Sequence, residues 1–529
     1  MTTVINTNVP AIVAKSNMDR VQRELEGSIA KLSSGSRINK AADDAAGMAV
    51  ANRMESQIRG LTMAVRHAKD GQNLIDTADG AQIEVSNILQ RLRELAVQAS
   101  SDTLDTNNRT FLNAEATALK LEINRISAQT RWNNLNLIDG SYAGKAFQVG
   151  FKGNETIDVS IDSAATTAIG AYNLHSEAYV ASSATGHNIT ATTMTLKGYL
   201  GSTTVTINAS ATNVNSSAER VAADINAVKE LTGVEASAIT KAKMSVVSAT
   251  GTMTFTLIGN KPVSGNEATA SKFQISAEIA DTKDLNPLVT AINQKSANTG
   301  ITAKVGATAA EVILTHSTGE DIEFLNVKVA GGTTGTFDLT ALDKYGNKLS
   351  LADTTLHRTL KASLNDSVTV GNATGTAQAV GHLTLTSIKS FSVAGDHATD
   401  EKGYFEANNY KGSANGGGTA QLSSVASLTI DTQEHATDAI ATLDGAIAKI
   451  DGQRADLGAI SNRLSHVADN NTAMITNTES SKSHILDTDF AVETTKLTRT
   501  QILQQAATSM LAQANASKQS VLALLQNLG

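Results

Sequence analysis

The last stretch of the chain, residues 497–529, carries an apolar pattern that repeats in alternating steps of four and three. This spacing is the heptad of a coiled coil, in which one narrow stripe of a helix faces its partner. No Gly or Pro interrupts it before Gly529. The pattern predicts a terminal helix whose stripe consists of Leu503, Ala507, Met510, Ala514, Ser517, Val521, Leu524 and Leu528.

A matching stripe lies near the start of the chain, where Val21, Leu25, Ser28 and Leu32 follow the same steps and Ile5, Val9 and Ile12 lie on a similar stripe. Isolated helices are marginal in water and gain stability from packing. We therefore expect the two ends to pair with each other and with neighbouring copies. On the pattern alone, a helix that folds back onto its own domain is an equal alternative. The predicted polymerisation seam comprises Val21, Leu25, Leu32, Leu503, Met510, Val521, Leu524 and Leu528.

Helical periodicity also fills the segments next to the two ends. A long helix is predicted from Asp43 to about Ser100, with a break near Gly60 as an alternative because Gly weakens a helix by about 1 kcal/mol relative to Ala. A second helix follows a polar turn, and a third opens at Asp431 and Glu434, which have the spacing of a capping box. Together these three helices predict an antiparallel bundle. In the second half of the first helix the three-four steps fall on Ala78, Gln82, Val85, Leu89, Leu92, Ala96 and Ala99. In the third helix they fall on Ile440, Leu443, Ile447, Ile450, Arg454, Leu457, Ser461, Leu464, Ala468, Asn471, Ile475 and Thr478.

The period changes from helix to strand at Arg131. Asp139-Gly140 is typical of a hairpin turn. Apolar residues then alternate on either side of Gly153-Asn154, which predicts a β-hairpin. Its apolar positions are Phe147, Val149 and Phe151, then Ile157, Val159 and Ile161.

The middle of the chain, from about residue 164 to 426, is rich in Thr, Ser, Ala, Gly and Asn, with short alternating runs. This composition predicts a β-rich insertion. It contains an internal repeat, since Ile225-Asn226 followed by Thr232-Gly233 recurs as Ile292-Asn293 followed by Thr299-Gly300. In each copy the Gly fits a helix stop that leads into a strand. The two helices are expected to start at a Ser216/Glu219 capping box and at Asn286-Pro287.

Composition and charge exclude several classes of function. The net charge of −8 without a basic stripe argues against nucleic acid as a partner. No segment has the apolar run of a membrane span. The 529 residues include no Cys, and the first residues lack the features of a secretory signal. The chain is therefore expected to be cytoplasmic, or to be exported by a route that does not use such a signal.

Signatures of enzymes are absent from the sequence. None of the 10 His residues begins His-Glu-X-X-His, and there is no P-loop, no Gly-X-Ser-X-Gly elbow and no Cys nucleophile. Glu320-Asp321 could form a metal or sugar site, but a solvated loop is the stronger interpretation. We therefore predict no catalytic residue, no metal and no cofactor.

Several long segments resemble one protein family and occur in the order that the family has them. The segments are KLSSGSRINKAADDAAGMAVANRM from Lys31, QRLRELAVQAS from Gln90, AQTRWNNLNLIDGS from Ala128, ADLGAISNRL from Ala455 and ILDTDFAVETTKLTRTQILQQAATSMLAQAN from Ile485. On these segments the chain resembles the bacterial flagellins, the filament subunits of the flagellum. The repeat in the insertion resembles a short repeat found in the variable regions of some flagellins and hook-associated proteins.

The resemblance implies an α+β, elongated multidomain fold, with a long antiparallel helical bundle that carries a β-hairpin and a β-rich central insertion. Residues 1–42 and 490–529 would be terminal coiled-coil segments that line the inner tube of the filament. Residues 43–165 and 427–489 would form a helical core domain in the outer tube wall. Residues 166–426 would be a surface-exposed variable insertion with two subdomains.

The resemblance also implies the function. The chain would polymerise into an extracellular flagellar filament that gives swimming motility, after export in an unfolded state by the flagellar type III apparatus. Its partners would be itself, an export chaperone on the C-terminal segment, and the hook-associated and cap proteins, with no nucleic acid and no membrane insertion. Two rival functions are a hook–filament junction protein and a filament-borne adhesin that acts through the insertion. The uninterrupted C-terminal segment favours the filament subunit.

Residues 90–98 resemble the patch that the vertebrate Toll-like receptor for flagellin recognises. The residues that map to this contact are Gln90, Arg91, Glu94 and Leu95, with Glu115 on the next helix. The primary role of these residues is expected to be contact with the adjacent subunit inside the filament.

Overall fold

The computed structural model describes residues 7–176, 180–181, 192–207, 217–259, 272–329, 336–346, 364–365, 367–370, 377–395 and 417–526. The chain divides into two compact units. The first unit contains residues 1–77, 143–160 and 457–529, and the second contains residues 78–142 and 161–456. Two long helices, α2 (Ala45–Ala99) and α8 (Gln433–Leu486), contribute residues to both units.

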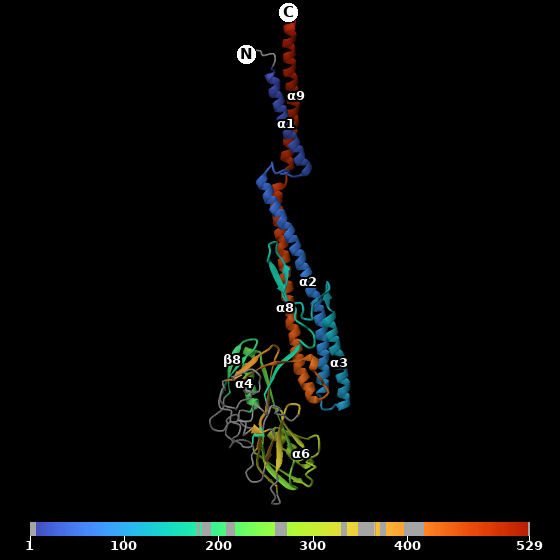
Figure 1. Ribbon diagram of the computed structural model, residues 1–529, viewed down its shortest axis with the longest axis vertical. Coiled ribbons are helices and arrows are strands. Elements are labelled where there is room, and N and C mark those ends of the chain that lie inside the picture. The colour runs from blue at the N-terminus through green and yellow to red at the C-terminus, as the bar shows by residue number, and fades with distance from the viewer. Residues whose placement is uncertain are drawn as a thin grey trace, which may run out of the picture. The chain divides into compact units, whose positions relative to one another are not determined.

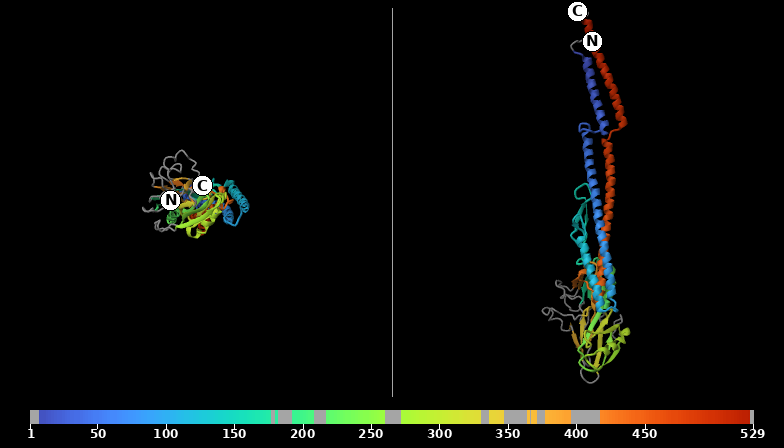
Figure 2. Two further views of the ribbon diagram at one scale, coloured as in Figure 1. Left: turned by 90° about the horizontal axis from the view of Figure 1, so that it is seen from below. Right: turned by 90° about the vertical axis from the view of Figure 1, so that its right-hand side faces the viewer.

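In the first unit, helices α1 (Val9–Ser34) and α9 (Phe490–Gln526) lie side by side (Figures 1 and 2). They run antiparallel, because Asn8 donates a hydrogen bond to the carbonyl of Ala514 while Gly35, at the other end of α1, accepts one from the backbone of Thr488. Helix α1 opens with Asn8, whose side chain accepts from the backbone N–H of Ala11. It ends at Gly35 in the left-handed conformation, as helix stops commonly do.

A short connection from Gly35 to Asp44 ties the end of α8 to the start of α2. The backbone N–H of Arg37 donates to the carbonyl of Leu486, and the Arg37 guanidinium donates to the carbonyl of Ile485. The carboxylate of Asp43 accepts from the backbone of Asn39 and Lys40, and these bonds lower its pKa. The connection is therefore held by its own hydrogen bonds and by the end of α8.

The β-hairpin in the first unit packs on α2 and α8. Strands β3 (Lys145–Gln148) and β4 (Thr156–Val159) pair antiparallel with Phe147 opposite Ile157, and Asn154 takes the left-handed conformation in the predicted turn. Asn471 of α8 is buried and donates to the carbonyl of Val149. Helix α2 is continuous through Gly60, so the break considered there does not occur. A Cβ at Gly60 would lie 2.9 Å from the Cβ of Phe151, so this glycine provides room for the hairpin.

In the second unit, α3 (Thr106–Gln129) turns back along α2 (Figure 1). The buried Arg109 closes the turn by donating to the carbonyls of Ala99, Leu104 and Ser101. The predicted apolar row of α2 is buried throughout this unit and comprises Ala78, Gln82, Val85, Leu89, Leu92, Ala96 and Ala99. The corresponding row of α8 includes the buried residues Leu443, Ile450, Leu457, Leu464, Ala468 and Asn471, the last four of which belong to the first unit.

Two local predictions were wrong. The small hairpin of β1 (Arg131–Trp132) and β2 (Leu135–Asn136) turns at Asn133-Asn134, both with positive φ, rather than at Asp139-Gly140. Asp139 instead accepts from the backbone and hydroxyl of Ser141, a local turn that its short side chain favours. The cap of α8 is Thr432 rather than Asp431, because the Thr432 hydroxyl accepts from the backbone of His435.

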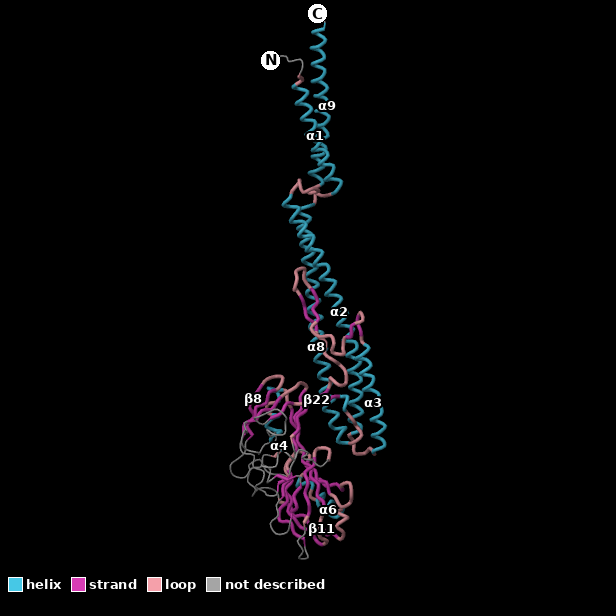
Figure 3. Tube along the Cα trace, in the orientation of Figure 1, coloured by secondary structure: helices cyan, strands magenta, loops and turns pink. Residues whose placement is uncertain are grey.

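The insertion is built from antiparallel strands with short helices (Figure 3). Among the described residues it forms three sheets. The largest has the order β12 (Ile301–Val305), β13 (Val312–His316), β9 (Glu235–Ser245), β19 (His382–Ser387), β5 (Gly170–His175) and β22 (Gln421–Ser424). In addition, β15 (Phe337–Leu342) pairs with β9, and β17 (Ser367–Val370) pairs with β15. The second has the order β11 (Phe273–Ile279), β10 (Gly251–Ile258), β14 (Ile322–Val329), β18 (Ala377–Ala379), β6 (Val180–Ala181) and β16 (Leu364–Asn365). The third has the order β21 (Gly417–Thr419), β20 (Ser392–Gly395), β7 (Thr192–Lys197) and β8 (Ser202–Ile207).

Two apolar cores support these sheets. One is centred on the ring cluster of Phe255, Phe324 and Phe337, and the other contains Leu196, Ile225 and Leu383. Because the chain has few aromatic residues, most of the remaining core is aliphatic.

The two copies of the internal repeat have the same local structure. Helices α4 (Ala218–Asn226) and α5 (Lys229–Thr232) end at Gly233 before β9, and α6 (Asn286–Asn293) and α7 (Ser296–Thr299) end at Gly300 before β12. Both glycines are left-handed, with φ of 72° and 70°. The second copy starts at Asn286-Pro287 as predicted. Ser216 lies outside the described residues, and Ser217 is in the cap position of α4.

We expect Gly80→Ala to raise the free energy of unfolding by about 1 kcal/mol, because nothing lies within 4 Å of the added Cβ. Gly60→Ala gains the same helix propensity but forces Phe151 to move, so this gain should be lost. Chemical denaturation of both variants and the parent chain measures the difference. Equal stabilisation by the two substitutions would show that the hairpin does not restrict Gly60.

Candidate functional site

The two terminal helices form the first candidate site. The less exposed residues of α1 and α9 recur in steps of three and four, as in a coiled coil. On α1 this row is Ala11, Ala14, Met18, Val21, Leu25, Ser28 and Leu32. On α9 it is Glu493, Leu497, Thr500, Gln504, Ala507, Leu511 and Ala514. The predicted stripe of α1 from Val21 to Leu32 therefore faces α9.

The predicted stripe of α9 is rotated away from this contact. Leu503 and Met510 remain 41% and 65% exposed, because α1 packs on the neighbouring row through Gln504 and Leu511. On α1, Val9 and Ile12 are likewise exposed, and Ala11 and Ala14 take the inner positions instead. Val521 and Leu524 lie in α9 where the side chains are not described, and Leu528 is outside the described residues.

The inner contact is partly polar. Gln504 donates to the side chain of Gln22 at 2.7 Å, and Thr500 and Ser28 are buried beside small or aliphatic neighbours. Polar pairs at such positions fix the register of a coiled coil at a cost in stability. The paired ends therefore carry an inner row that sets their alignment and an outer apolar row, which we define as Leu503, Met510, Val9 and Ile12, that they leave in water.

The second candidate site is the patch on α2 and α3. Arg91 donates to Glu94 at 2.9 Å and to Glu115 of α3 at 3.0 Å, and both carboxylates raise the pKa of Arg91. Gln90, Arg91, Glu94 and Glu115 are exposed. Leu95 is only 1% exposed and packs in the core. The patch at the surface therefore consists of four of the five predicted residues, and Leu95 supports it from beneath.

The insertion is fastened to α3 where the chain enters and leaves it. Asn124 accepts from the backbone and hydroxyl of Thr166 at the entry. At the exit, Lys120 donates to the carbonyl of Leu428 at 2.7 Å, and Asn113 accepts from the backbone of Ile430. Partial burial lowers the pKa of Lys120. Both connections are thus held by side chains of one helix.

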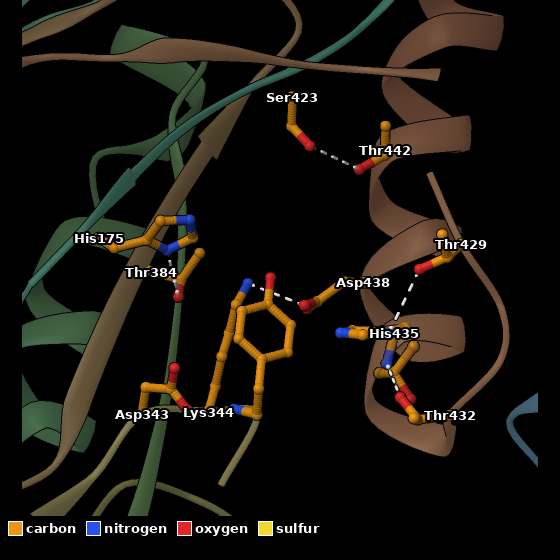
Figure 4. A network of polar contacts seen from close by, with 12 residues as sticks. His175, Asp343, Lys344, Thr384, Ser423, Thr429, Thr432, His435, Asp438 and Thr442 are labelled. Carbon is orange, nitrogen blue, oxygen red and sulfur yellow. Dashed lines mark hydrogen bonds and ion pairs between the residues drawn. The ribbon is translucent and has the colours of Figure 1, made fainter. Parts of the chain in front are cut away.

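A polar network joins the insertion to the first turns of α8 (Figure 4). Lys344 forms an ion pair with Asp438 at 3.0 Å, and Lys241 pairs with Glu434 at 3.3 Å. Glu434 therefore contributes to this contact rather than to the predicted capping box. Burial, followed by the charge of Asp438, raises the pKa of Tyr345, whose ring packs on His435.

Two histidines of the insertion, His175 and His382, lie near Lys344 of this network and stack on each other with ring centroids 5.6 Å apart. Burial lowers the pKa of His175 to about 4 and that of His382 to about 4. Both rings are therefore neutral at pH 7, and Lys344 nearby disfavours their charged forms. Their contribution to stability is lost as the pH falls from 6.5 towards 4.

Glu320 and Asp321 do not lie in a solvated loop, so that interpretation was wrong. Glu320 is 6% exposed and Asp321 is fully buried. Gln378 donates to Asp321 at 2.7 Å. Burial, with the adjacent charges of Asp321 and Glu219, raises the pKa of Glu320 to about 7. No group of His, Cys, Asp and Glu suited to hold a metal ion occurs within the described ranges.

The comparisons with known proteins agree with the resemblance. The chain matches the bacterial flagellin N-terminal helical region over residues 5–143 and the C-terminal helical region over residues 440–525. It also matches the flagellin hook IN motif over residues 193–250, which include the first copy of the repeat. The chain is 35% identical over 527 residues to the B-type flagellin of Pseudomonas aeruginosa, covering 99% of this chain and 100% of that protein. The chain belongs to the bacterial flagellin family.

Other flagellins are similar over the same length. The flagellin of Salmonella typhimurium is 31% identical over 544 residues, which cover 99% of this chain and all of that protein. Flagellin B of Vibrio cholerae is 30% identical over 521 residues, with 98% and 99% covered. Among solved structures, FliC from Burkholderia pseudomallei is 18% identical and covers 74% of this chain and 99% of its own, with a TM-score of 0.27.

Membership of this family decides the broad function. The chain is a filament subunit of bacterial flagella, a structural rather than catalytic protein, which acts outside the cell and polymerises with itself. The fold is the mixed α+β type expected, with long terminal helices and a β-rich central insertion. In the portion of the chain that is described, every helix is too short or too polar to span a membrane.

Glu320→Gln is expected to stabilise the chain at pH 8 and to leave its stability at pH 4.5 unchanged. The pKa of Glu320 is raised from 4.5 to about 7 on folding, so the parent chain loses stability as the pH rises through this window, by about 3 kcal/mol at most. Denaturant unfolding of parent and variant at the two pH values measures the difference. The same stability difference at both pH values would contradict a buried neutral Glu320.

Proposed function

We propose that the outer apolar row of the paired terminal helices makes the contacts between neighbouring subunits in the filament. The observation that carries this proposal is the exposure of Leu503 and Met510 on a helix whose inner row is already occupied by α1. Val521, Leu524 and Leu528 continue the same steps along the sequence. Val21, Leu25 and Leu32 contribute by holding α1 on α9, so that two helices present the row together.

The energetics favour this role. Large apolar side chains at regular steps on a solvent-facing helix gain roughly 25 cal/mol for each Å² that a partner removes from water. The partly polar inner seam buries Val21 and Leu25 but not Leu503 and Met510. Neighbouring copies provide that gain, and a repeating contact that does not close on itself builds an open helical polymer.

On this proposal the chain has three parts. Residues 1–42 and 490–529 form the inner tube, residues 43–165 and 427–489 form the outer wall, and residues 166–426 are exposed on the filament surface. In support, the insertion is fastened to α3 at both of its connections by Lys120, Asn113 and Asn124.

We further propose that the chain passes unfolded through the flagellar type III apparatus, with a chaperone on its C-terminal segment until export. The exposed apolar residues of α9 are the surface that a chaperone would cover. The hook-associated and cap proteins would meet the same terminal helices at the two ends of the filament, because only there do those helices lack a neighbouring subunit.

Met510→Asp is expected to abolish filament elongation and to leave the monomer as stable as the parent, because Met510 is 65% exposed before assembly. Electron microscopy of chains seeded with short filament fragments gives the first result, and thermal unfolding gives the second. Gln505→Asp, on the opposite side of α9 and also exposed, is the matched control and should elongate. Normal filaments from Met510→Asp would exclude the outer row from assembly.

The patch of Gln90, Arg91, Glu94 and Glu115 contacts the adjacent subunit as its primary role, and in the free chain it is the surface for the Toll-like receptor of vertebrates. Arg91 supports this proposal, because it joins α2 and α3 into one charged surface through Glu94 and Glu115. Leu95 contributes only through the packing beneath that surface.

Arg91→Ala is expected to weaken activation of receptor-bearing cells by the free chain severalfold, with no change in the thermal midpoint. Exposed ion pairs contribute little to stability, so a loss of activation would report on recognition. Arg125→Ala removes a comparable exposed arginine, one that pairs with Glu122 within α3, and should retain full activation. Equal activation by the two variants would remove Arg91 from the receptor surface.

A further inference from the structure

Strand β12 is at one edge of the largest sheet of the insertion. Its described pairing is to β13 alone, from Ile301 opposite His316 to Val305 opposite Val312. In an antiparallel pair, alternate residues direct their backbone N–H and C=O groups toward the partner, and the remaining residues direct theirs outward. An edge strand therefore exposes a row of unpaired groups to which another strand can bind.

Three outward groups of β12 are taken by two side chains of the repeat. The backbone N–H of Ala303 donates to Oδ1 of Asn293 at 2.8 Å, and Nδ2 of Asn293 donates to the carbonyl of Ala303, also at 2.8 Å. The N–H of Ile301 donates to Oγ1 of Thr299 at 3.2 Å. The Asn293 side chain thus makes the two hydrogen bonds that a neighbouring strand would make to Ala303.

The first copy of the repeat has the same arrangement at a second edge. Strand β13 pairs with β9 only from Thr240 to Met244, so the beginning of β9 has no described strand on that side. There the N–H and C=O of Ala236 bond to Asn226, each at 2.8 Å. The N–H of Val234 donates to Oγ1 of Thr232 at 3.3 Å. Two edges are closed by the same pair of residue types.

We propose that Asn226 and Asn293 are edge plugs, which prevent strands of a second copy of this chain from adding to the sheet of the insertion. Asparagine suits the task, because its amide carries one acceptor and two donors on a short, fixed side chain and so imitates a peptide group. Helices α4 and α6 end at these residues, which places each amide against the strand that follows.

The partner that the plugs exclude is a second copy, because a filament holds many identical subunits together and raises the local concentration of each edge for its neighbours. Two β12 strands could pair antiparallel about Ala303, with Thr302 of one copy opposite Lys304 of the other. Lys304, whose exposed side chain pairs with the exposed Asp102 at 3.6 Å, places a charged residue at this edge, a second feature that commonly discourages strand addition.

Because the sequence has no Cys, this pairing can be tested directly by introducing cysteines into the full chain. No filament fragments are added as seeds, so that the chain stays unpolymerised. Thr302→Cys chains and Lys304→Cys chains are mixed in equal amounts and oxidised, with or without Asn293→Ala in both. Directly opposite residues of this kind have Cα atoms close enough for a disulfide. With Asn293→Ala, we expect a severalfold rise in the mixed dimer over either homodimer, because only the antiparallel pairing favours the mixed product.

Hydrogen exchange of the peptide that contains residues 301–305 supplies the second measurement. With Asn293→Ala the amide of Ala303 should exchange about tenfold faster, as expected when the hydrogen bond that this N–H donates is lost. Leu288→Ala is the matched control, since it leaves a cavity under α6 and destabilises the same region with the plug in place. Thr299→Val removes only the hydrogen bond that the N–H of Ile301 donates to the Thr299 hydroxyl, so it frees one backbone group and leaves the bonds of Asn293 in place. A mixed dimer no more abundant than in Leu288→Ala, or unchanged exchange at residues 301–305, would overturn the proposal.

Discussion

The packing of α1 along α9 is the contact on which the proposed assembly through the terminal helices depends. Each helix can turn only one stripe toward the other, and here that stripe contains Gln22, Ser28, Thr500 and Gln504 beside small and aliphatic residues. Such a seam aligns the two ends and buries Val21 and Leu25, but it leaves Leu503 and Met510 in water. A pair built in this way is specific in register and incomplete in burial, which is the state that a polymerising subunit requires before it meets its neighbours.

The alignment of that pair is set where α1 ends and α9 begins, at the connection from Gly35 to Asp44 that bonds to the end of α8. Backbone groups of Gly35 and Arg37 bond to Thr488 and Leu486, so the start of α9 is fixed relative to the end of α1. The carboxylate of Asp43 fixes the connection from within. The segment KLSSGSRINKAADD, which carries much of the family resemblance, is therefore explained by local hydrogen bonds as well as by helix packing.

Long periodic segments were predictable from the sequence, and single polar contacts were not. The rows of α2 and α8 were correct because many buried positions agree on one period, as from Ala78 to Ala99. The stripe predicted on α9 is not the one that meets α1, because Ala507 and Ala514 belong to two overlapping stripes and only the partner helix decides which one is inside. Three local predictions failed for a related reason, because a neighbouring feature overrides the local pattern. Thr432 caps α8 in place of Asp431, and the Asn133-Asn134 turn replaces the one predicted at Asp139. Glu320 is buried by the surrounding sheet.

A subunit that must self-associate at its ends must also avoid self-association elsewhere, and the two requirements call for opposite surfaces. The terminal helices leave Leu503 and Met510 in water, where a neighbouring copy can bury them. The insertion has the opposite kind of surface. Strand edges carry backbone N–H and C=O groups that can pair with another strand, and at Ala236 and Ala303 asparagine side chains already bond to these groups. A strand edge pairs with almost any extended chain, whereas a heptad row requires a partner of matching period. On the two proposals together, copies of the chain would meet through helices, and the strand edges of the insertion would be kept from pairing.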